Sequence, residues 1–288
     1  MYKDGIDFVL VSYTKPEYAK QCIKSIDLFF KDIPKNIYVV CNYLDKDKEM
    51  SKLEKLLPPI ILRCSKSYLW KRWKNKSNQE IFEEIYRNNI WGKSPTSANV
   101  FFSGGGSHGA DVVSSYVNSV KKFLSSLKNK PVIVDIGCGD FNIGKNFLTI
   151  AKKYIGGDVV PSLIDFNKKT HRHKNLSFIH LDAVRDELPK GEVVIIRQVL
   201  QHLSNAQIHS ILRKIILNYD YLILTEHLPT TENFVANVDI PVGHLIRANV
   251  NSGLDIEKPP LNFEAKSKKI IDEISHSGGK IQTIVYEL

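Results

Sequence analysis

The chain has 288 residues, of which 43% are hydrophobic and 25% are charged, and its formal net charge at pH 7 is +9. These values are ordinary for a soluble globular protein of one large domain or one domain and a fragment, and no stretch approaches the ~20 apolar residues that a membrane span requires. The 4 cysteines lack C-x-x-C spacing and the first residues lack a signal-peptide pattern, so we expect a cytoplasmic protein without a zinc site.

The first segment, 1–65, alternates strand and helix patterns as a βαβαβ half-sheet does. Strand patterns lie at 6–14, 36–43 and 59–64, and helix patterns at 15–30 and 46–57. The run SYTKPEYAKQCIKSI followed by IYVVCNYLDKD resembles the start of family 2-type glycosyltransferases. These enzymes bind metal through a D-x-D that comes later than Asp45 and Asp47, so we interpret the segment as a non-catalytic remnant or accessory module. A half-sheet of this size is marginal alone, which predicts packing on the main domain or on a partner such as a glycosyltransferase.

The next segment, 66–110, is predicted to be a connector. It begins with KSYLWKRWKNK, where lysines and arginines alternate with Tyr68, Trp70 and Trp73. Such a cluster could contact phosphates and stack on bases. The other basic residues of the chain are spread out, so we interpret the cluster as an amphipathic stretch that packs on the fold. We therefore do not expect nucleic acid as the partner.

A glycine-rich run, SGGGS at Ser103–Ser107, precedes a clear helix pattern. The run has no core pattern, which leaves two interpretations, a flexible linker or a lid over a bound ligand. From Asp111 to Leu127 the apolar residues recur at helical spacing. This predicts a helix with one buried face at the start of the main domain, 111–288.

The stretch VIVDIGCGDFNIGKNFL indicates a strand, a tight glycine turn and a helix. Gly137 and Gly139 follow the apolar strand, which is the layout in which an α/β sheet holds a nucleotide-like ligand. A dinucleotide fingerprint needs a third glycine where this chain has Asn142. The turn is flanked by Asp135 and Asp140, and carboxylates repel a pyrophosphate but suit a ligand that carries an ammonium and a sulfonium.

Strand and helix patterns alternate over the rest of the main domain. Strands are predicted for YIGGDVV and for 175–184, 192–197, 219–227 and 281–286, and helices for 142–151, 162–169, 205–217 and 264–276, with Ser204 as a helix N-cap. This alternation predicts an α/β fold with a doubly wound, mostly parallel sheet.

The D-x-G-x-G-D run that starts at Asp135, followed by G-x-D ending at Asp158, resembles motifs I and II of the class I S-adenosylmethionine-dependent methyltransferases. An acidic residue at that distance is placed to accept hydrogen bonds from ribose hydroxyls. The resemblance covers roughly residues 80–288 and implies a Rossmann-like methyltransferase sheet with S-adenosyl-L-methionine as the cofactor. The cofactor contacts that it implies are Ser103, Gly105, Ser107, Asp135, Gly137, Gly139, Asp140, Asp158, Val159, Asp182, Ala183 and Arg197.

The pattern W-G…S-G-G-G-S also resembles N-terminal segments of methyltransferases found beside glycosyltransferases in surface-glycan pathways of bacteria and large viruses. This resemblance favours the lid over the linker. It implies an enzyme that O-methylates a sugar hydroxyl of a glycan or glycan precursor. Two alternatives stay open, namely a methyltransferase for another small molecule or nucleic acid, and a non-catalytic binding protein of the same fold.

An alcohol acceptor loses a proton on attack and benefits from a nearby base. His202 follows the strand at 192–197 and His227 ends the strand at 219–227, so both belong to the carboxyl edge of the sheet. We predict His202, His227 and Glu226 as the catalytic candidates. Their alternatives are a structural turn residue for His202 and an exposed loop position for His227.

The segment 228–262 is long and lacks strong periodicity, which is typical of functional insertions. We expect acceptor recognition there, and its polar candidates are Asp239, His244, Arg247, Asn251 and Asp255. Asp182, Glu226, His227 and Asp239 do not have a spacing that indicates a metal site. The methyltransferase fold has one more antiparallel strand than we count, so either that strand is absent or a predicted element is wrong.

Overall fold

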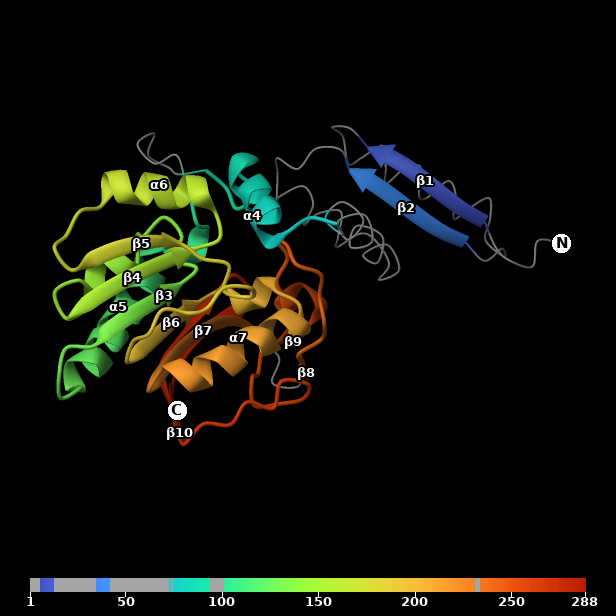
Figure 1. The fold of residues 1–288 in the computed structure, drawn as a ribbon. Helices are drawn as coiled ribbons and strands as arrows, with labels where there is room; N and C mark the ends of the chain where they lie inside the picture. The colour runs from blue at the N-terminus through green and yellow to red at the C-terminus, as the bar shows by residue number, and fades with distance from the viewer. Residues whose placement is uncertain (1–5, 13–34, 42–72, 74, 94–100, 231–233) are drawn as a thin grey trace. The chain divides into compact units, whose positions relative to one another are not determined.

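The structure is a computed structural model, and it describes residues 6–12, 35–41, 73, 75–93, 101–230 and 234–288 (Figure 1). The chain divides into two compact units, Met1–Asn75 and Lys76–Leu288. In the first unit, β1 (Ile6–Ser12) and β2 (Lys35–Cys41) pair in parallel, which confirms two predicted strands.

Several predictions for the N-terminal part lie outside the described residues. They are the helices at 15–30 and 46–57, the strand at 59–64 and most of the basic and aromatic cluster at 66–76. The glycosyltransferase-like character of 1–65 therefore stays a prediction.

The second unit is built on a seven-stranded mixed sheet (Figure 1). Its order is β10-β11-β7-β6-β3-β4-β5, and β11 runs antiparallel to both neighbours while the other pairs are parallel. The bounds are β3 (Val132–Ile136), β4 (Lys153–Asp158), β5 (Leu176–His180), β6 (Val193–Arg197), β7 (Tyr221–Pro229), β10 (Ser267–His276) and β11 (Gly279–Glu287). The α/β, mostly parallel, doubly wound sheet is confirmed, and its strand order is the Rossmann-like methyltransferase topology.

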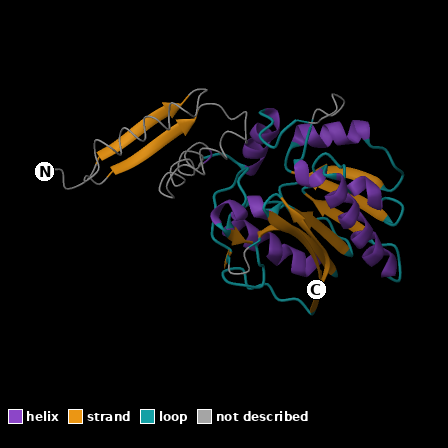
Figure 2. Ribbon diagram, turned by 180° about the vertical axis from the view of Figure 1, so that it is seen from behind, coloured by secondary structure: helices purple, strands orange, loops and turns teal. Residues whose placement is uncertain are grey.

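Helices cover both faces of this sheet. Figures 1 and 2 show α7 (Asn205–Asn218) on one face and α5 (Ala110–Ser126) on the other. The other two α-helices among the described residues are α4 (Asn78–Arg87) and α6 (Pro161–Thr170). The predicted cap is present, because the Ser204 hydroxyl accepts a hydrogen bond from Gln207 N at the start of α7. The buried face of α5 packs into the main core, as its helical spacing predicts.

The predicted helix at 142–151 is wrong. The chain forms only a short 3₁₀ turn there, η2 (Gly144–Phe147). Phe141 has a positive φ of 60° and a buried ring, and the Asn146 side chain donates to the carbonyl groups of Asn142 and Ile143. Asparagine side chains that bond to nearby backbone groups compete with a regular helix. The apolar residues of this segment therefore pack from a compact turn and not from the face of a helix.

The predicted helix at 264–276 is also wrong, because this segment is the edge strand β10. The pairing of β10 with β11 shifts by one residue between Ile270 and Asp272. A β-bulge adds a residue and breaks the strict alternation that marks a strand, which leaves the half-buried Ile271 and Ile274 three residues apart, a helical spacing. β10 is the additional antiparallel strand that the methyltransferase fold has, and it forms a hairpin with β11 at the end of the chain.

The segment between β7 and β10 is largely irregular. It contains the 3₁₀ turn η4 (Arg247–Val250) and a two-stranded pair of β8 (Val235–Ala236) with β9 (Ser252–Gly253). Two further 3₁₀ turns, η1 (Gly105–Ser107) and η3 (Leu200–His202), belong to the site described below. Among the described helices, none has the length and apolar character that a bilayer crossing requires.

Candidate functional site

The glycine turn after β3 lies where the sheet order reverses. From β3 the chain continues to β4 and β5 on one side and to β6 and β7 on the other, and ligands of such sheets bind at the carboxyl ends beside this reversal. Gly137 and Gly139 have φ values of 74° and 54°. A Cβ on Gly137 would lie 2.4 Å from Val199 Cγ2, and one on Gly139 would lie 2.5 Å from Ser103 Oγ. The turn therefore requires glycine at both positions, for backbone conformation and for space.

Two buried carboxyl groups flank this turn from adjacent strands. Asp158, at the end of β4, accepts hydrogen bonds from Gly139 N and Val160 N, both at 3.1 Å. Asp135, in β3, accepts one from the Tyr154 hydroxyl at 2.8 Å. Burial raises the pKa of Asp135 to about 7 and that of Asp158 to about 6. Both groups retain capacity to accept hydrogen bonds from a ligand.

The third aspartate of the turn, Asp140, is used by the protein itself. Its carboxylate accepts from Ser103 N at 3.1 Å and from Asn142 N at 3.2 Å, and it pairs with His108 Nε2 at 2.6 Å. Its own N–H donates to Ser103 Oγ. Asp140 therefore ties residues 103–108 to the glycine turn.

Three further predicted cofactor contacts lie after β5 and after β4. Asp182 is half-buried, accepts from Val184 N at 3.0 Å and lies 3.8 Å from Arg185 Nε. Ala183 is buried, and the half-buried Val159 offers its carbonyl to His180 Nε2 at 3.1 Å. These residues follow the carboxyl ends of β4 and β5, which neighbour each other in the sheet.

A buried arginine ends β6 next to the glycine turn. Arg197 donates from Nη2 to Gly106 O at 2.7 Å and from Nη1 to Ser107 Oγ at 3.4 Å, and its guanidinium lies 4.8 Å from the centre of the Tyr116 ring. Its Nε is buried without a hydrogen-bond partner, and it forms no ion pair with a described carboxylate. Burial lowers the pKa of Arg197 from its ordinary value.

Residues Ser103–Ser107 are thus bonded to the sheet edge at several points. Besides the bonds to Asp140 and Arg197, Ser107 O accepts from Asn142 Nδ2 at 2.8 Å. A Cβ on Gly106 would lie 2.3 Å from Gln198 Oε1, so this glycine permits the close approach of the segment. A lid would have to lie at this edge, and the lid remains a prediction.

The three catalytic candidates differ in how their polar atoms are used. Glu226 is buried and accepts from Leu200 N and Gln201 N, both at 3.2 Å, which caps η3. Burial raises the pKa of Glu226 to about 8. His202 is buried in η3 with its Nδ1 3.3 Å from Leu245 O, and burial lowers its pKa to about 4.

His227 is placed differently, at the rim of the sheet. Its Nε2 lies 3.0 Å from His276 O. A carbonyl can only accept, so the neutral ring carries its proton on Nε2 and its lone pair on Nδ1. Nδ1 has no hydrogen-bond partner among the described residues. Burial lowers the pKa of His227, so the neutral form prevails at pH 7.

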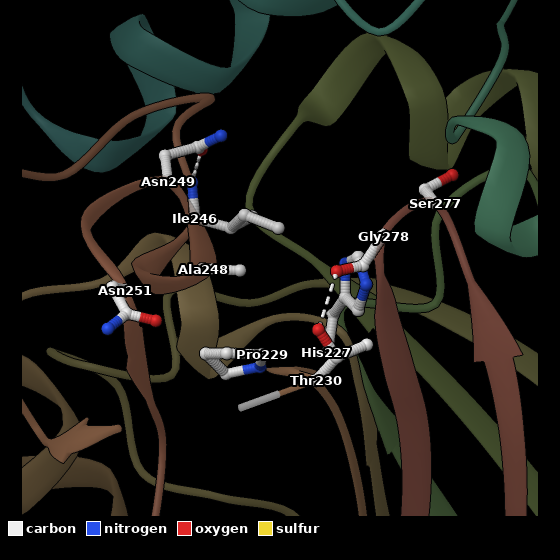
Figure 3. Close-up of a pocket in the computed structure, with 9 residues that line it drawn as sticks. All are labelled: His227, Pro229, Thr230, Ile246, Ala248, Asn249, Asn251, Ser277 and Gly278. Atoms are coloured by element: carbon white, nitrogen blue, oxygen red, sulfur yellow. Dashed lines mark hydrogen bonds between the residues drawn. The ribbon is translucent and has the colours of Figure 1, made fainter. Parts of the chain in front are cut away.

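His227 also lines a pocket of about 210 Å³ at the carboxyl end of β7 (Figure 3). One wall comes from the η4 region and the other from the end of β7 and the turn between β10 and β11. The lining residues are His227, Pro229, Thr230, Ile246, Ala248, Asn249, Asn251, Ser277 and Gly278. The sequence singled out His227 and Asn251, but it did not assign the turn at 277–278 to the site, because a helix at 264–276 would not form a hairpin there.

The other predicted acceptor residues of 228–262 serve the fold or lie outside this pocket. Arg247 is 1% exposed and donates to the carbonyl groups of Leu200 and Leu203. Asp239 accepts from Asn205 N, and Asp255 lies 3.5 Å from Lys258 Nζ. His244 is not one of the pocket-lining residues. Among the described residues no three His, Cys, Asp or Glu side chains gather in a metal-binding group.

No protein-family model matches the chain, and no curated protein matches its sequence. Solved structures resemble it in fold. The N-terminal domain of EvdMO1 with SAH bound is 13% identical at a TM-score of 0.47, and the match covers 74% of this chain and 99% of that one. NodS, an N-methyltransferase from Bradyrhizobium japonicum in complex with SAH, is 12% identical at a TM-score of 0.45, and the match covers 62% of this chain and 88% of that one.

Human N-acetylserotonin methyltransferase in complex with SAM is 14% identical at a TM-score of 0.46, and the match covers 73% of this chain. This chain spans 59% of the length of the human protein. These are likenesses of fold, and we derive the function from the side chains of this chain.

Proposed function

We propose that this protein is an S-adenosylmethionine-dependent methyltransferase that O-methylates a sugar hydroxyl of a glycan or glycan precursor. The observation that carries the proposal is a row of polar side chains at the carboxyl ends of four neighbouring strands. Arg197, Asp135 and Asp158 belong to β6, β3 and β4, and Asp182 follows β5, in the order in which these strands lie in the sheet.

The order of these side chains along the sheet edge matches the order of the functional groups along the cofactor. Neighbouring strands are ~4.8 Å apart, so four strand ends span roughly 14 Å, the scale of an extended nucleoside with an amino-acid tail. Arg197 would hold the carboxylate, Asp135 the ammonium, Asp158 the ribose hydroxyls and Asp182 the adenine amino group. Val159 and Ala183 would adjoin the adenine.

The buried guanidinium of Arg197 supports this orientation. A buried charge without an ionic partner is costly, and a carboxylate ligand would offset that cost. The carboxylates near the glycine turn disfavour a pyrophosphate, and Asn142, where a dinucleotide fingerprint needs glycine, is hydrogen-bonded to Ser107 O. The site therefore fits S-adenosylmethionine better than a dinucleotide.

The cofactor supplies a methyl group on a sulfonium, and its transfer to a hydroxyl oxygen leaves a neutral thioether and releases one proton. Among His202, His227 and Glu226, we assign the role of proton acceptor to His227, because its Nδ1 lone pair has no hydrogen-bond partner in the described part of the chain. Glu226 accepts hydrogen bonds from the backbone of η3, and His202 contacts the backbone of the loop at Leu245.

The sugar acceptor is supported by the resemblance of the SGGGS segment and of residues 1–65 to glycan enzymes. A cytoplasmic location, a glycosyltransferase as partner through residues 1–65, and the absence of a nucleic-acid partner are parts of the same proposal.

Replacing Asp158 with asparagine should weaken S-adenosylmethionine binding by roughly tenfold to a hundredfold. The change removes charge-assisted hydrogen bonds to the ribose, worth about 1.5–3 kcal/mol each. Calorimetric titration of the full chain measures it, with NAD as the control ligand. Equal affinity of the variant and the native protein, or tighter binding of NAD, would contradict the proposed function.

The affinity for S-adenosylmethionine should fall roughly tenfold when the pH drops from 7 to 5.5. Burial raises the pKa of Asp135 to about 7, so this carboxyl takes up its proton across this range and no longer attracts an ammonium. Titrations at several pH values measure the slope, and Asp135→Asn is the matched control because it should bind weakly with a flatter profile. A flat profile for the native chain would rule out an ionised Asp135 as the ammonium partner.

A further inference from the structure

We propose that the pocket at the carboxyl end of β7 is the acceptor site and that it takes one uncharged, hydroxyl-bearing ring. The inference rests on the proposed function and adds the place and the charge class of the acceptor. It starts from the pocket's position, because β7 neighbours β6, whose carboxyl end carries Arg197. His227 lies two residues beyond Thr225, the register partner of Arg197. At ~3.3 Å per residue, His227 therefore extends about 7 Å past the end of β6 on the edge where the cofactor would bind.

Contacts within each wall of the pocket fix its shape. Figure 3 shows the two walls facing each other, with the Ala248 side chain directed toward the space between them. Ser277 and Gly278 form a two-residue hairpin turn with φ values of 46° and 72°, the signs typical of tight hairpins. Asn249 Oδ1 accepts from Ile246 N at 3.0 Å, which fixes the opposite wall. Such a preformed concave site loses little conformational entropy on binding.

The polar groups of the pocket are neutral. None of the nine described lining residues is Asp, Glu, Lys or Arg. Amide and hydroxyl groups come from Thr230, Asn249, Asn251 and Ser277, and both kinds of group donate and accept hydrogen bonds as sugar hydroxyls do. A charged acceptor would be desolvated here without a described ionic partner, which costs free energy.

The size and the apolar part of the lining favour a single ring. The volume of about 210 Å³ is below the ~300 Å³ at which pockets for drug-sized ligands begin. Pro229, Ile246 and Ala248 provide an apolar surface for the C–H face of a ring. The remainder of a glycan would extend into solvent.

His227 gives the pocket its chemistry. The bond from Nε2 to His276 O orients the ring and leaves the Nδ1 lone pair for an acceptor hydroxyl. This hydroxyl would pass its proton to Nδ1 as its oxygen forms the bond to the methyl carbon, and the imidazolium would later release the proton to solvent. The ring position depends on Gly279, where a Cβ would lie 2.4 Å from His227 Nε2.

The test is sugar binding by the full chain and by two alanine-to-phenylalanine variants. Ala248→Phe fills the pocket, and Ala236→Phe places the same bulk on β8, outside the lining. Saturation-transfer NMR with methyl α-D-glucopyranoside, galactopyranoside and mannopyranoside measures binding of neutral rings, and methyl glucuronoside is the anionic comparison. Thermal unfolding checks that each variant folds.

We expect at least one neutral glycoside to bind the native chain and Ala236→Phe, and to bind Ala248→Phe at least tenfold more weakly. Glucuronoside should bind none of them measurably. Unchanged binding by Ala248→Phe, a preference for glucuronoside, or no binding of any neutral glycoside would overturn the proposal.

The same proteins are titrated with S-adenosylmethionine, and Ala248→Phe should bind it as the native chain does. If the native chain binds sugar but not S-adenosylmethionine, the pocket stands and the proposed function fails. If it binds S-adenosylmethionine but none of the sugars, the methyltransferase assignment stands and the pocket assignment fails.

Discussion

Replacing Arg247 with methionine should lower the midpoint of thermal unfolding by roughly 10 °C. Removing one partner of a buried, hydrogen-bonded charge cluster costs about 3–5 kcal/mol, and 1 kcal/mol corresponds to roughly 2–4 °C for a domain of this size. Arg247 donates to Leu200 O at 3.1 Å, to Leu203 O at 2.9 Å and to Asn205 Oδ1 at 2.8 Å. Methionine fills much of the space but leaves these acceptors without a donor.

The matched control is Arg213→Met on the exposed side of α7, which should shift the midpoint by less than about 2 °C. Calorimetry of the full chain gives both values. A shift for Arg247→Met as small as that of the control would show that the guanidinium does not hold η3 in place.

The loss should also depend on pH, because Arg247 is a positive charge that lowers the pKa of Glu226. Burial nevertheless raises the pKa of Glu226 to about 8, above the unfolded value of 4.5. A carboxyl whose pKa is raised on folding favours the folded state at low pH, and this stability is lost as the pH rises from 4.5 to 8. Without Arg247 the pKa of Glu226 rises further, so the variant's destabilisation should be smaller at pH 5 than at pH 8.5.

Arg247 also shows where sequence reasoning fails. The residue lies in an irregular segment rich in polar groups, which is typical of a recognition loop. Only the structure shows that the guanidinium turns inward to the carbonyl groups of η3. The partners of a buried arginine are set by long-range contacts, and the local pattern does not encode them.

The strand and turn at β3 could be predicted because its signals are local. An apolar run, two glycines and a nearby carboxylate specify a strand, a positive-φ turn and a polar strand end within a few residues. The sheet followed from strand and helix alternation. β10 could not be predicted in this way, because its bulge at Ile271 disturbs the period of two and its pairing with β11 depends on the tertiary fold.

The same distinction applies to the site. The predicted residues Asp135, Gly137, Gly139 and Asp158 adjoin one another because motif spacing and strand order place them at one edge. The sequence does not predict the different roles of Glu226, His202 and His227, because these roles depend on hydrogen-bond partners that the tertiary structure supplies. Glu226 accepts hydrogen bonds from backbone N–H groups, His202 lies against a loop carbonyl, and His227 keeps the lone pair of Nδ1 at a pocket.

His227→Gln should reduce methyl transfer by roughly a hundredfold to ten-thousandfold and leave S-adenosylmethionine binding unchanged. General base catalysis contributes about this factor, and glutamine retains a polar side chain that cannot take up the proton. The measurement is transfer of label from methyl-labelled S-adenosylmethionine to the neutral glycoside that binds the native chain. His209→Gln, on the exposed side of α7, is the matched control and should retain full activity.

The pH profile separates a base from a residue that only shapes the pocket. Burial lowers the pKa of His227 below its ordinary value of 6.5, so at saturating S-adenosylmethionine the native rate should rise with pH on the acidic side, with a midpoint below pH 6.5. His227→Gln should lose the part of this rise that comes from titration of the imidazole. The pH dependence of cofactor affinity that Asp135 causes should persist in the variant. A variant that loses rate but keeps the native profile would assign His227 a positioning role, because a group that takes the proton must impose its own titration on the rate.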